Sequence, residues 1–400
     1  MRYRRFAALL AVIFFAACMP ADEERLIEPL SAAGGGANPG LGPGTHALSS
    51  GPGYKGSPSW SPQGDRIAFT VDGYVVDKPV DAGGLRRWTA GAFVAEDVEW
   101  TSESSLAIFG VASSSAPEVG KGKASRSLYR ARAQAGSPEV EEVRSKVLAM
   151  SPGPEEENLI VALQSETNES RFALMQDNGV VDRSYNRIVK GRVTGLSLSP
   201  DGRRVALVAR RRASSELHVM DLEEGTHRKV TRLHQDLEIL GAPQWTTRGI
   251  CYVAGKEEAL GDGGATPLYD LYLVPSVSGE PEPMPGVGED FVASSIRVSP
   301  DGERLAIIGR LNPNSPINLY VLDPEAEDLE DLTINEDMDI KTGPDDLAWS
   351  PDGESVAIIA RGALSDEPRV RAGPADALLE DFYNLYEIPV EGISTEGAAR

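Results

Sequence analysis

The sequence predicts an all-β fold, namely a seven-bladed β-propeller of four-stranded antiparallel blades. The first observation behind this prediction is a unit that recurs seven times: an apolar residue, then Ser or Thr, often Pro-Asp-Gly, and then a run of β-forming residues. The Ser or Thr that marks each unit stands at residues 61, 101, 151, 199, 246, 299 and 350, so the period is 40 to 53 residues. Periods of this length are typical of propellers, solenoids and other repeat arrays.

The second observation is the strand pattern inside each unit. A step such as Pro200-Asp201-Gly202 is typical of a tight turn, because Pro presets φ, Asp bonds the local backbone and Gly adopts a left-handed conformation. It joins two strands, here called A and B. A third run with period-two alternation, C, follows after a variable loop, as in 217–221, and a short fourth run, D, ends the unit, as in 228–231. Four antiparallel strands repeated radially form propeller blades, whereas a helical solenoid would need apolar faces of helical period.

The two ends of the chain predict how the ring closes. The last unit reaches its C strand at 385–388, and residues 392–397 make a poor D strand. Residues 45–50 precede the first marker without A or B strands of their own, and Ser49 lies 11 residues before Trp60, as Thr89 lies 11 residues before Trp100. We therefore expect residues 45–50 to supply the outer strand of the seventh blade, which leaves no break between the first and last blades.

Four of the markers are preceded by tryptophan, at Trp60, Trp100, Trp245 and Trp349. Rings of this size fill the tapering space between neighbouring sheets, and large aromatic side chains dominate the energetics of cores. We therefore expect these four side chains to form inter-blade core rather than a cofactor site.

These units resemble the TolB-type, WD-like propeller repeat, whose hallmark is a Trp-Ser-Pro-Asp-Gly turn followed by an Ile-Ala-Phe strand and a later Leu-Tyr-Val strand. Matching segments here include Trp349-Ser350-Pro351-Asp352-Gly353 and Leu319-Tyr320-Val321, and the likeness covers about residues 45–400. The resemblance implies the fold but no particular activity, because the repeat occurs in TolB, in the propeller of LpqB-like lipoproteins and in the gating domains of prolyl oligopeptidases. Only a short linker precedes the first blade here, so the partners of those proteins are not carried over.

The N-terminal residues predict an exported bacterial lipoprotein. Three arginines within the first five residues form a basic region, and the apolar stretch that follows is too short to span a bilayer. It ends in Phe15-Ala16-Ala17-Cys18, which resembles the lipobox, although the first position is usually Leu; an ordinary signal peptide with a chance Cys is the alternative. We expect residues 1–17 to be the signal peptide, Cys18 the lipidated residue, 18–44 a disordered tether and 45–400 the propeller.

Charge and cysteine content exclude several classes of partner and cross-link. The formal charge is −22, and cleavage after Ala17 would remove three arginines, so the mature chain is more negative still. A field of this sign argues against nucleic acid and against lying flat on an anionic membrane. With Cys18 acylated, Cys251 has no partner for a disulfide, and we expect it to be a small buried hydrophobe.

Catalytic and metal signatures are weak. There is no Gly-x-Ser-x-Gly elbow, phosphate loop or His-Glu-x-x-His motif. The four histidines match no metal-ligand spacing; they are His46, His218, His227 and His234. One calcium-loop spacing occurs, at positions one, three, five and twelve of the stretch that begins at Asn335, with Asp337, Asp339 and Asp346 as the further ligands. Ile340 stands where that loop needs Gly, and Asp346 where it needs Glu, so we interpret this stretch as a solvated acidic loop and expect neither metal nor cofactor.

The loops predict where a ligand binds. The A-to-B turns are short and uniform, whereas the B-to-C loops on the opposite face vary in length, at 113–127, 256–267, 312–316 and 363–382. Function tends to lie on variable loops held by a rigid scaffold, so the B-to-C face is the predicted binding surface. In the longest loop, residues 374–383 have Pro at a first helical position and apolar residues on one side, which predicts a short helix across the ring mouth or a flap over blade edges.

Three arginines occupy the same position at the end of strand B, namely Arg210, Arg310 and Arg361. All three are expected to emerge on the B-to-C face. A ring of guanidinium groups in so acidic a protein would offer bidentate contacts to a carboxylate or phosphate, and pairing with neighbouring loop acids is the alternative.

Taken together, these patterns predict a monomeric propeller outside the cytoplasm, anchored to the cell membrane or outer membrane through Cys18, that binds a protein, peptide or envelope polymer and is not an enzyme. The alternative is a propeller lyase or hydrolase with carboxylates in its central channel, or a gate of the prolyl-oligopeptidase type that acts in trans. An enzyme of this kind would gather ionisable residues with shifted pKa values at the channel mouth.

Overall fold

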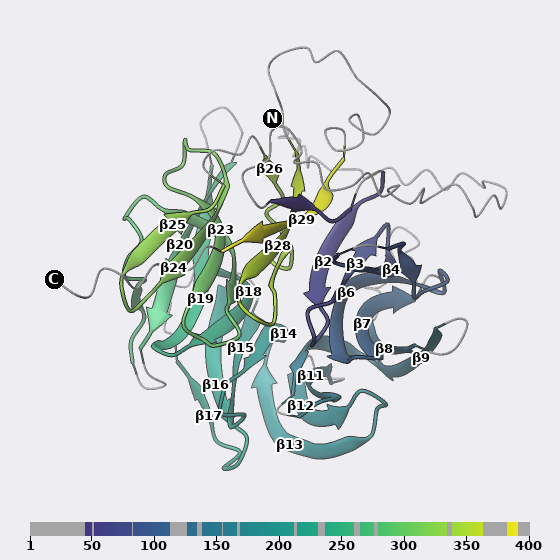
Figure 1. The fold of residues 1–400 in the computed structure, drawn as a ribbon. Coiled ribbons are helices and arrows are strands. Elements are labelled where there is room, and N and C mark those ends of the chain that lie inside the picture. Colours follow the sequence, from purple (N-terminus) through teal and green to yellow (C-terminus); the bar gives the residue numbers. More distant parts are fainter. Residues whose placement is uncertain are drawn as a thin grey trace, which may run out of the picture.

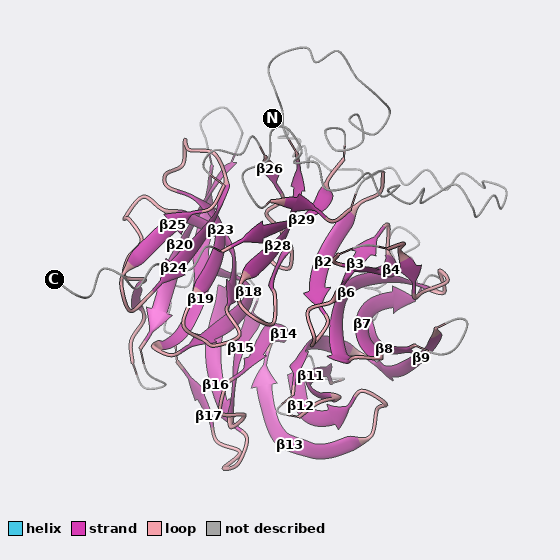
Figure 2. Cartoon of the chain, viewed as in Figure 1, coloured by secondary structure: helices cyan, strands magenta, loops and turns pink. Residues whose placement is uncertain are grey.

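The structure, a computed structural model, describes residues 45–49, 52–81, 83–112, 126–133, 138–153, 155–165, 169–211, 214–230, 237–259, 265–275, 279–333, 338–362 and 382–390. These residues form strands joined by turns and loops, as Figure 2 shows. Within them, no helix is long and apolar enough to cross a membrane. The predicted signal peptide, Cys18 and the predicted tether lie outside the described residues.

Seven antiparallel sheets surround a central axis, which confirms the predicted seven-bladed propeller (Figure 1). Blade 1 contains β2 (Lys55–Trp60), β3 (Arg66–Val71), β4 (Tyr74–Pro79) and β5 (Arg86–Arg87). Blade 2 contains β6 (Phe93–Ser102), β7 (Ser105–Ala112), β8 (Arg126–Arg132) and β9 (Glu139–Ser145). Blade 3 contains β10 (Val147–Pro152), β11 (Asn158–Gln164), β12 (Glu169–Gln176) and β13 (Val181–Lys190). In each blade these strands are A, B, C and D from the centre outward.

Blades 4 to 6 repeat the same order. Blade 4 contains β14 (Arg192–Leu198), β15 (Arg204–Arg211), β16 (Ser214–Asp221) and β17 (His227–Lys229). Blade 5 contains β18 (Glu238–Thr246), β19 (Gly249–Ala259), β20 (Ala265–Val274) and β21 (Glu282–Pro283). Blade 6 contains β22 (Val292–Val298), β23 (Leu305–Arg310), β24 (Asn318–Asp323) and β25 (Asp328–Asp331). Blade 7 differs because two short strands share its innermost position. It contains β26 (Asp339–Ile340), β27 (Leu347–Trp349), β28 (Ser355–Arg361), β29 (Asn384–Pro389) and, outermost, β1 (His46–Ala47).

The N-terminal strand closes the ring, as the sequence predicts. Strand β1 pairs antiparallel with β29, with His46 opposite Glu387, so the two ends of the propeller meet in one sheet. The backbone N–H of Leu48 donates to the Leu385 carbonyl at 2.8 Å. Ser49 Oγ accepts a hydrogen bond of 2.8 Å from the Leu385 N–H.

The same two bonds hold the outer strands of other blades. In blade 6, the Leu332 N–H donates to the Leu319 carbonyl at 2.9 Å, and Thr333 Oγ1 accepts from the Leu319 N–H at 3.0 Å. In blade 1, Thr89 Oγ1 accepts from the Val75 N–H at 2.9 Å. Leu48 and Ser49 therefore take the place of a D strand and of the hydroxyl that follows it.

The A-to-B turns have the chemistry that the sequence predicts. The glycines that end four of these turns lie in the left-handed region, with φ of 75°, 68°, 79° and 72° at Gly64, Gly202, Gly302 and Gly353. In the turn of blade 4, the Arg203 N–H donates to Asp201 Oδ1 at 3.0 Å, and the Gly202 N–H donates to the Ser199 carbonyl at 2.9 Å. Uniform turns result, and all lie on one face of the ring.

The core lies between neighbouring blades, and each marker tryptophan packs there as predicted. Trp100, for example, belongs to a buried cluster that contains Ala68 and Val75 of blade 1 together with Leu106 of blade 2. Cys251 is fully buried in the cluster shared by blades 5 and 6, as expected for a small hydrophobe.

Each marker tryptophan also donates its indole N–H across the blade boundary to the backbone of the preceding A strand. The acceptors are the carbonyls of Ala348, Ser59, Ser197 and Arg297, for Trp60, Trp100, Trp245 and Trp349 respectively, at 3.3, 3.1, 3.1 and 2.9 Å. The bond of Trp60 joins blade 1 to blade 7, so it adds a second link at the closure of the ring.

Replacing Leu48 by Ala tests the closure. Its side chain is 3% exposed and packs with Ile67, Phe69 and Leu385, so truncation should lower the free energy of unfolding by about 2–5 kcal/mol. Denaturant unfolding measures the change. The matched control is His46→Ala on the exposed side of the same strand, which should cost less than about 0.5 kcal/mol. Equal effects of the two variants would contradict the assignment of Leu48 to the core of blades 7 and 1.

Candidate functional site

The A strands of all seven blades line a central cavity of about 780 Å³. A volume in this range is typical of a ligand site. Prolines of the A-to-B turns lie at its rim, among them Pro62, Pro200, Pro300 and Pro351. The cavity therefore opens on the face that carries the uniform turns.

A local irregularity shapes the wall of this cavity. The A strands of blades 1 to 6 each contain a register shift a few residues before the marker, between Gly56 and Ser59, Ala95 and Asp97, Val147 and Ala149, Val193 and Gly195, Leu240 and Gln244, and Ala293 and Ser295. In blade 7 the stretch 341–346 interrupts the inner strand between β26 and β27, and its two ends, Lys341 and Asp346, both make backbone hydrogen bonds to Ile359 of β28. Such bulges bend a strand and re-aim its side chains, and they are common beside functional sites.

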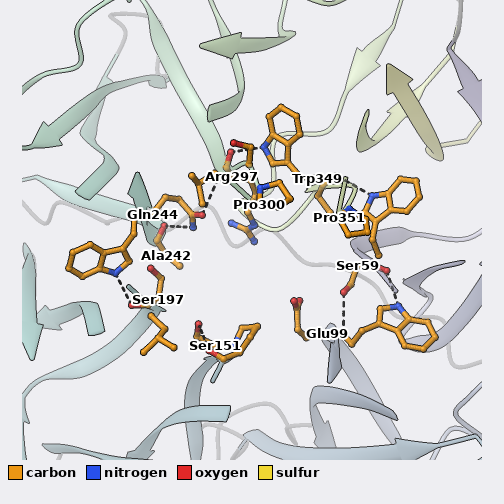
Figure 3. Close-up of a pocket in the computed structure, with 18 of the residues that line it drawn as sticks. Ser59, Glu99, Ser151, Ser197, Ala242, Gln244, Arg297, Pro300, Trp349 and Pro351 are labelled. Atoms are coloured by element: carbon orange, nitrogen blue, oxygen red, sulfur yellow. Dashed lines mark hydrogen bonds between the residues drawn. The ribbon is translucent and has the colours of Figure 1, made fainter. Parts of the chain in front are cut away.

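One position of the repeat supplies most of the polar wall. It lies two residues before the marker, and its occupants around the cavity are Ser59, Glu99, Ser197, Gln244, Arg297 and Ala348. Figure 3 labels the first five of them. The tryptophan of the next blade binds the backbone carbonyl of this position in four cases. The backbone is therefore fixed while the side chain differs from blade to blade.

Blades 6 and 7 contribute an ion pair to the cavity. Arg297 Nη2 lies 2.7 Å from Asp345 Oδ1. Asp345 belongs to the stretch 341–346, which is held against blade 6 by a 3.0 Å hydrogen bond from Ser295 Oγ to the Pro344 carbonyl. The carboxylates raise the pKa of Arg297 although burial opposes this, so the guanidinium stays charged.

Two carboxyl groups of blade 2 face the same cavity. Burial raises the pKa of the Glu99 carboxyl to about 7, although the Arg297 charge and a hydrogen bond with Ser59 act in the opposite direction. Burial, followed by the negative charges of Asp345 and Glu99, raises the pKa of the Asp97 carboxyl. Among the described residues that line the cavity, three carboxyl groups thus share one guanidinium, so ionisation of all three gives the cavity an excess of negative charge.

This arrangement favours two kinds of chemistry. A cationic group that enters the cavity would stabilise the ionised forms of Asp97 and Glu99, which repel each other and Asp345. A carboxyl group whose pKa lies near 7 is also able to donate a proton to a bound molecule. Among the described residues, no group of three His, Cys, Asp or Glu side chains has the arrangement of a metal site.

The three predicted arginines take equivalent positions, at the ends of β15, β23 and β28, but each has its own partner. Arg210 Nη1 lies 2.6 Å from Glu238 Oε1, and Arg361 Nη2 lies 2.6 Å from Asp339 Oδ2. Arg310 Nη1 donates to the Pro313 carbonyl at 3.0 Å. The structure does not bring these side chains to one shared partner, and their binding of an anion stays a prediction.

The calcium-loop residues are only partly within the described residues, because Asn335 and Asp337 lie outside them. Asp339 pairs with Arg361 and accepts a 2.9 Å hydrogen bond from the Tyr383 hydroxyl. Asp346 is buried rather than solvated, because Lys341 Nζ lies 3.0 Å from its carboxylate and the stretch 341–346 folds back on blade 7.

Most of the predicted B-to-C binding surface also lies outside the described residues. This applies to the segments 113–125, 260–264 and 363–381, and with them to residues 374–381 of the predicted helix. The loop of blade 6 is described and is tied to itself by a 3.0 Å hydrogen bond from the Ser315 N–H to the Asn312 carbonyl. The role of the B-to-C face stays a prediction.

Sequence reasoning missed Asp97, Glu99, Arg297 and Asp345, although a signal for two of them is present. When the units are aligned on the marker, the position two residues before it holds Ser, Glu, Ala, Ser, Gln, Arg and Ala. At this position the charge differs from unit to unit, whereas the strand and turn residues on either side of it recur in the repeats. Such a position is typical of a surface that the fold itself does not need. Asp97 and Asp345 have no such signal, because a bulge and a long interruption place them.

Comparison with known proteins supports the fold. No protein-family model and no curated protein matches the chain. Among solved structures, it is similar to the tricorn protease, with 13% identity and a TM-score of 0.53 over 86% of this chain and 34% of that chain. It is also similar to a chain of the mitotic checkpoint complex, with 13% identity and a TM-score of 0.50 over 89% and 96%. TolB from Acinetobacter baumannii is similar at 14% identity, with a TM-score of 0.44 over 82% and 77%.

These similarities concern the fold alone, because the identities are low. The chain spans 34% of the length of the tricorn protease chain. The seven sheets of the chain itself define it as a propeller, and the chemistry of its cavity has to be argued from its own residues.

The raised pKa of Glu99 predicts a pH dependence of stability. The folded protein holds this proton more tightly than the unfolded chain, whose Glu pKa is about 4.3. The contribution of Glu99 to the free energy of unfolding should therefore be fully present below about pH 4 and should be lost as the pH rises towards about 7. Glu99→Gln removes this loss, so its stability relative to the wild type should increase between pH 4 and pH 8 by on the order of 2 kcal/mol.

Denaturant unfolding at both pH values measures this difference. The control is Glu103→Gln, which removes an exposed carboxylate from the turn that follows the same strand. Its effect on stability should be small at both pH values, because the side chain that it changes is exposed. A Glu99→Gln variant that behaves like this control would show that Glu99 titrates as an ordinary surface acid.

Proposed function

We propose that this protein is a binding propeller that captures a basic segment of another protein or a peptide at the A-to-B mouth of its central cavity. The observation that carries the proposal is the imbalance of charge in the cavity, where Asp97, Glu99 and Asp345 share a single guanidinium, that of Arg297, among the described lining residues. A Lys or Arg side chain that enters from the mouth would supply the missing charge. The varied polar side chains of the other blades would then set which segments fit.

The surroundings of the mouth support the same class of ligand. Exposed aspartates stand on four of the turns around it, at Asp65, Asp201, Asp301 and Asp352. The chain as a whole carries a formal charge of −22. A field of this sign attracts basic segments over a distance and raises their rate of association at low ionic strength.

The proposal includes the anchor and location that the N-terminal sequence predicts. Lipidation of Cys18 would hold the propeller at a membrane outside the cytoplasm, and residues 18–44 would serve as a tether of low complexity. A tethered propeller of this kind is suited to capture a partner near the membrane. The partner in this proposal is a protein or peptide, and neither nucleic acid nor a cofactor is involved.

Binding of a fluorescent tetra-arginine peptide tests the proposed site. Glu99→Gln should weaken binding at least tenfold, because the charge that it removes faces the bound guanidinium in a cavity of low dielectric constant. Binding to the wild type should strengthen from pH 6 to pH 8, since the peptide competes with protons for Glu99 and Asp97. Fluorescence anisotropy measures both effects.

The matched control for this experiment is Glu103→Gln, which removes the same charge from the exposed rim. It should change the affinity less than twofold. If Glu103→Gln and Glu99→Gln weaken binding equally, the peptide is held by the general field of the protein, and the cavity is not the site. A tetra-glutamate peptide should not bind to either variant.

Cys18→Ala tests the anchor. The variant should move from the membrane fraction to the soluble fraction and should no longer incorporate labelled palmitate. Cys251→Ala is the control, because the Cys251 thiol is buried in β19. Retention of Cys18→Ala in the membrane fraction would overturn the lipoprotein assignment.

An enzyme with carboxyl groups in the channel is the second candidate, and one observation favours it. Asp97 and Glu99 are ionisable residues with raised pKa values in the central cavity, as such an enzyme requires. Turnover of envelope polysaccharides or peptides by the wild type, abolished in Glu99→Gln, would establish this function. Binding without turnover supports the first proposal.

A further inference from the structure

Arginine side chains gather at the B-to-C end of the channel, opposite the mouth that the proposed function uses. Arg192 is the first residue of β14, the innermost strand of blade 4. The other end of this strand leads into the A-to-B turn, so Arg192 lies at the B-to-C end of the channel wall. Gly191 before it has a φ of 110°, and its carbonyl accepts a 3.0 Å hydrogen bond from Ser170 Oγ of blade 3. The backbone that carries Arg192 is therefore held between two blades.

A second arginine stands directly opposite Arg192 in the same sheet. Arg210 of β15 is its partner in the antiparallel ladder. Residues that are directly opposite in such a ladder share one face of the sheet, with Cβ atoms about 4.5–5.5 Å apart, and like charges in this arrangement destabilise the pair of strands. The pairing of β14 with β15 therefore does not by itself account for two arginines at these positions.

A third arginine acts on Arg192 from blade 2. Burial, followed by the positive charge of Arg126 on β8, lowers the pKa of Arg192, and Arg210 adds to this effect. The negative charge of Glu96 on β6 acts in the opposite direction. A guanidinium group nevertheless stays protonated in proteins. The half-buried Arg192 side chain therefore keeps a positive charge that two further positive charges oppose.

Two of these three arginines have a carboxylate of their own, and the third does not. Arg126 Nε lies 2.7 Å from Glu96 Oε2, and Arg210 Nη1 lies 2.6 Å from Glu238 Oε1. Among the described residues, no carboxylate forms an ion pair with Arg192. These three guanidinium groups and two carboxylates leave one positive charge in excess, in a chain whose formal charge is −22. A single negative charge would balance this cluster.

We propose that Arg192 anchors a site for a single carboxylate group, supplied by the C-terminal end of a peptide or by a small organic acid. The planar guanidinium of Arg192 binds both oxygens of the carboxylate. Arg126 and Arg210 add positive potential, whereas Glu96 and Glu238 repel ligands that carry further negative charges. The site therefore selects a monoanion over a polyanion. It does not rest on the proposed function, because the acidic cavity at the other mouth contributes no residue to it.

Saturation-transfer NMR of the full chain with N-acetyl-tetraglycine tests the site, because the only charge of this peptide is its C-terminal carboxylate. The wild type should bind the acid about 10- to 100-fold more tightly than the C-terminal amide, which lacks that charge. Arg192→Gln should lower the affinity for the acid to that for the amide. Propionate separates the two sources of the carboxylate. Binding as tight as that of the peptide acid assigns the site to small organic acids, and weaker binding assigns it to a chain end.

Arg203→Gln is the matched control, because it removes the same charge from the A-to-B turn of blade 4, where the side chain is 64% exposed. This variant and Glu99→Gln should both bind the acid as the wild type does, so this site can fail or hold independently of the acidic cavity. If Arg192→Gln binds the acid as tightly as the wild type, or if the wild type binds acid and amide equally, the proposal is wrong.

Denaturant unfolding separates a binding role of Arg192 from a structural one. Arg192→Gln removes the repulsion with Arg210, so it should unfold at the same denaturant concentration as the wild type or at a higher one. A clearly lower midpoint would show that the fold itself needs Arg192, and would overturn its assignment as a residue kept for a ligand.

Discussion

The hydrogen bond from a marker tryptophan to the preceding A strand is the interaction on which the rest of the structure depends. In four of the seven blades the indole N–H binds the carbonyl of the residue that lines the cavity. A buried donor and acceptor are satisfied together, and the ring fills the gap between sheets. The bond fixes the backbone of this cavity-lining residue and leaves its side chain free to differ from blade to blade. At the boundary of blades 5 and 6, where Val298 replaces the tryptophan, the Val298 N–H binds Gln244 Oε1 instead.

Closure of the ring turns these separate contacts into a cavity with a complete wall. Blades 7 and 1 are joined by β1, by the bond from Trp60 to the Ala348 carbonyl, and by the core around Leu48. The stretch 341–346 of blade 7 then places Asp345 against Arg297 of blade 6. The pairing of the chain ends therefore helps to keep the wall of the central cavity complete.

The repeat made the fold predictable, because turn chemistry, strand period and marker spacing all indicate the same four-stranded blade as the repeating unit. Even the outer strand that residues 45–50 supply is predictable, since Ser49 lies as far before Trp60 as Thr89 lies before Trp100. The residues of the candidate site are harder to predict from the sequence. Glu99 and Arg297 vary at one repeat position, but Asp97 and Asp345 are brought in by a bulge and by an interrupted strand. Neither irregularity has a sequence period, and the burial that raises the pKa of the Asp97 carboxyl exists only in the folded chain.

The central claim is that ligands enter the cavity at the A-to-B mouth. Site-specific photo-crosslinking in intact cells tests it most directly, with the photoreactive residue at Ser151, which lines the cavity, or at Asn314, which is exposed on the described B-to-C loop of blade 6. Crosslinked partners should form from position 151 and should disappear when Glu99→Gln is added. Partners that form only from position 314 would contradict the claim and would assign binding to the opposite face.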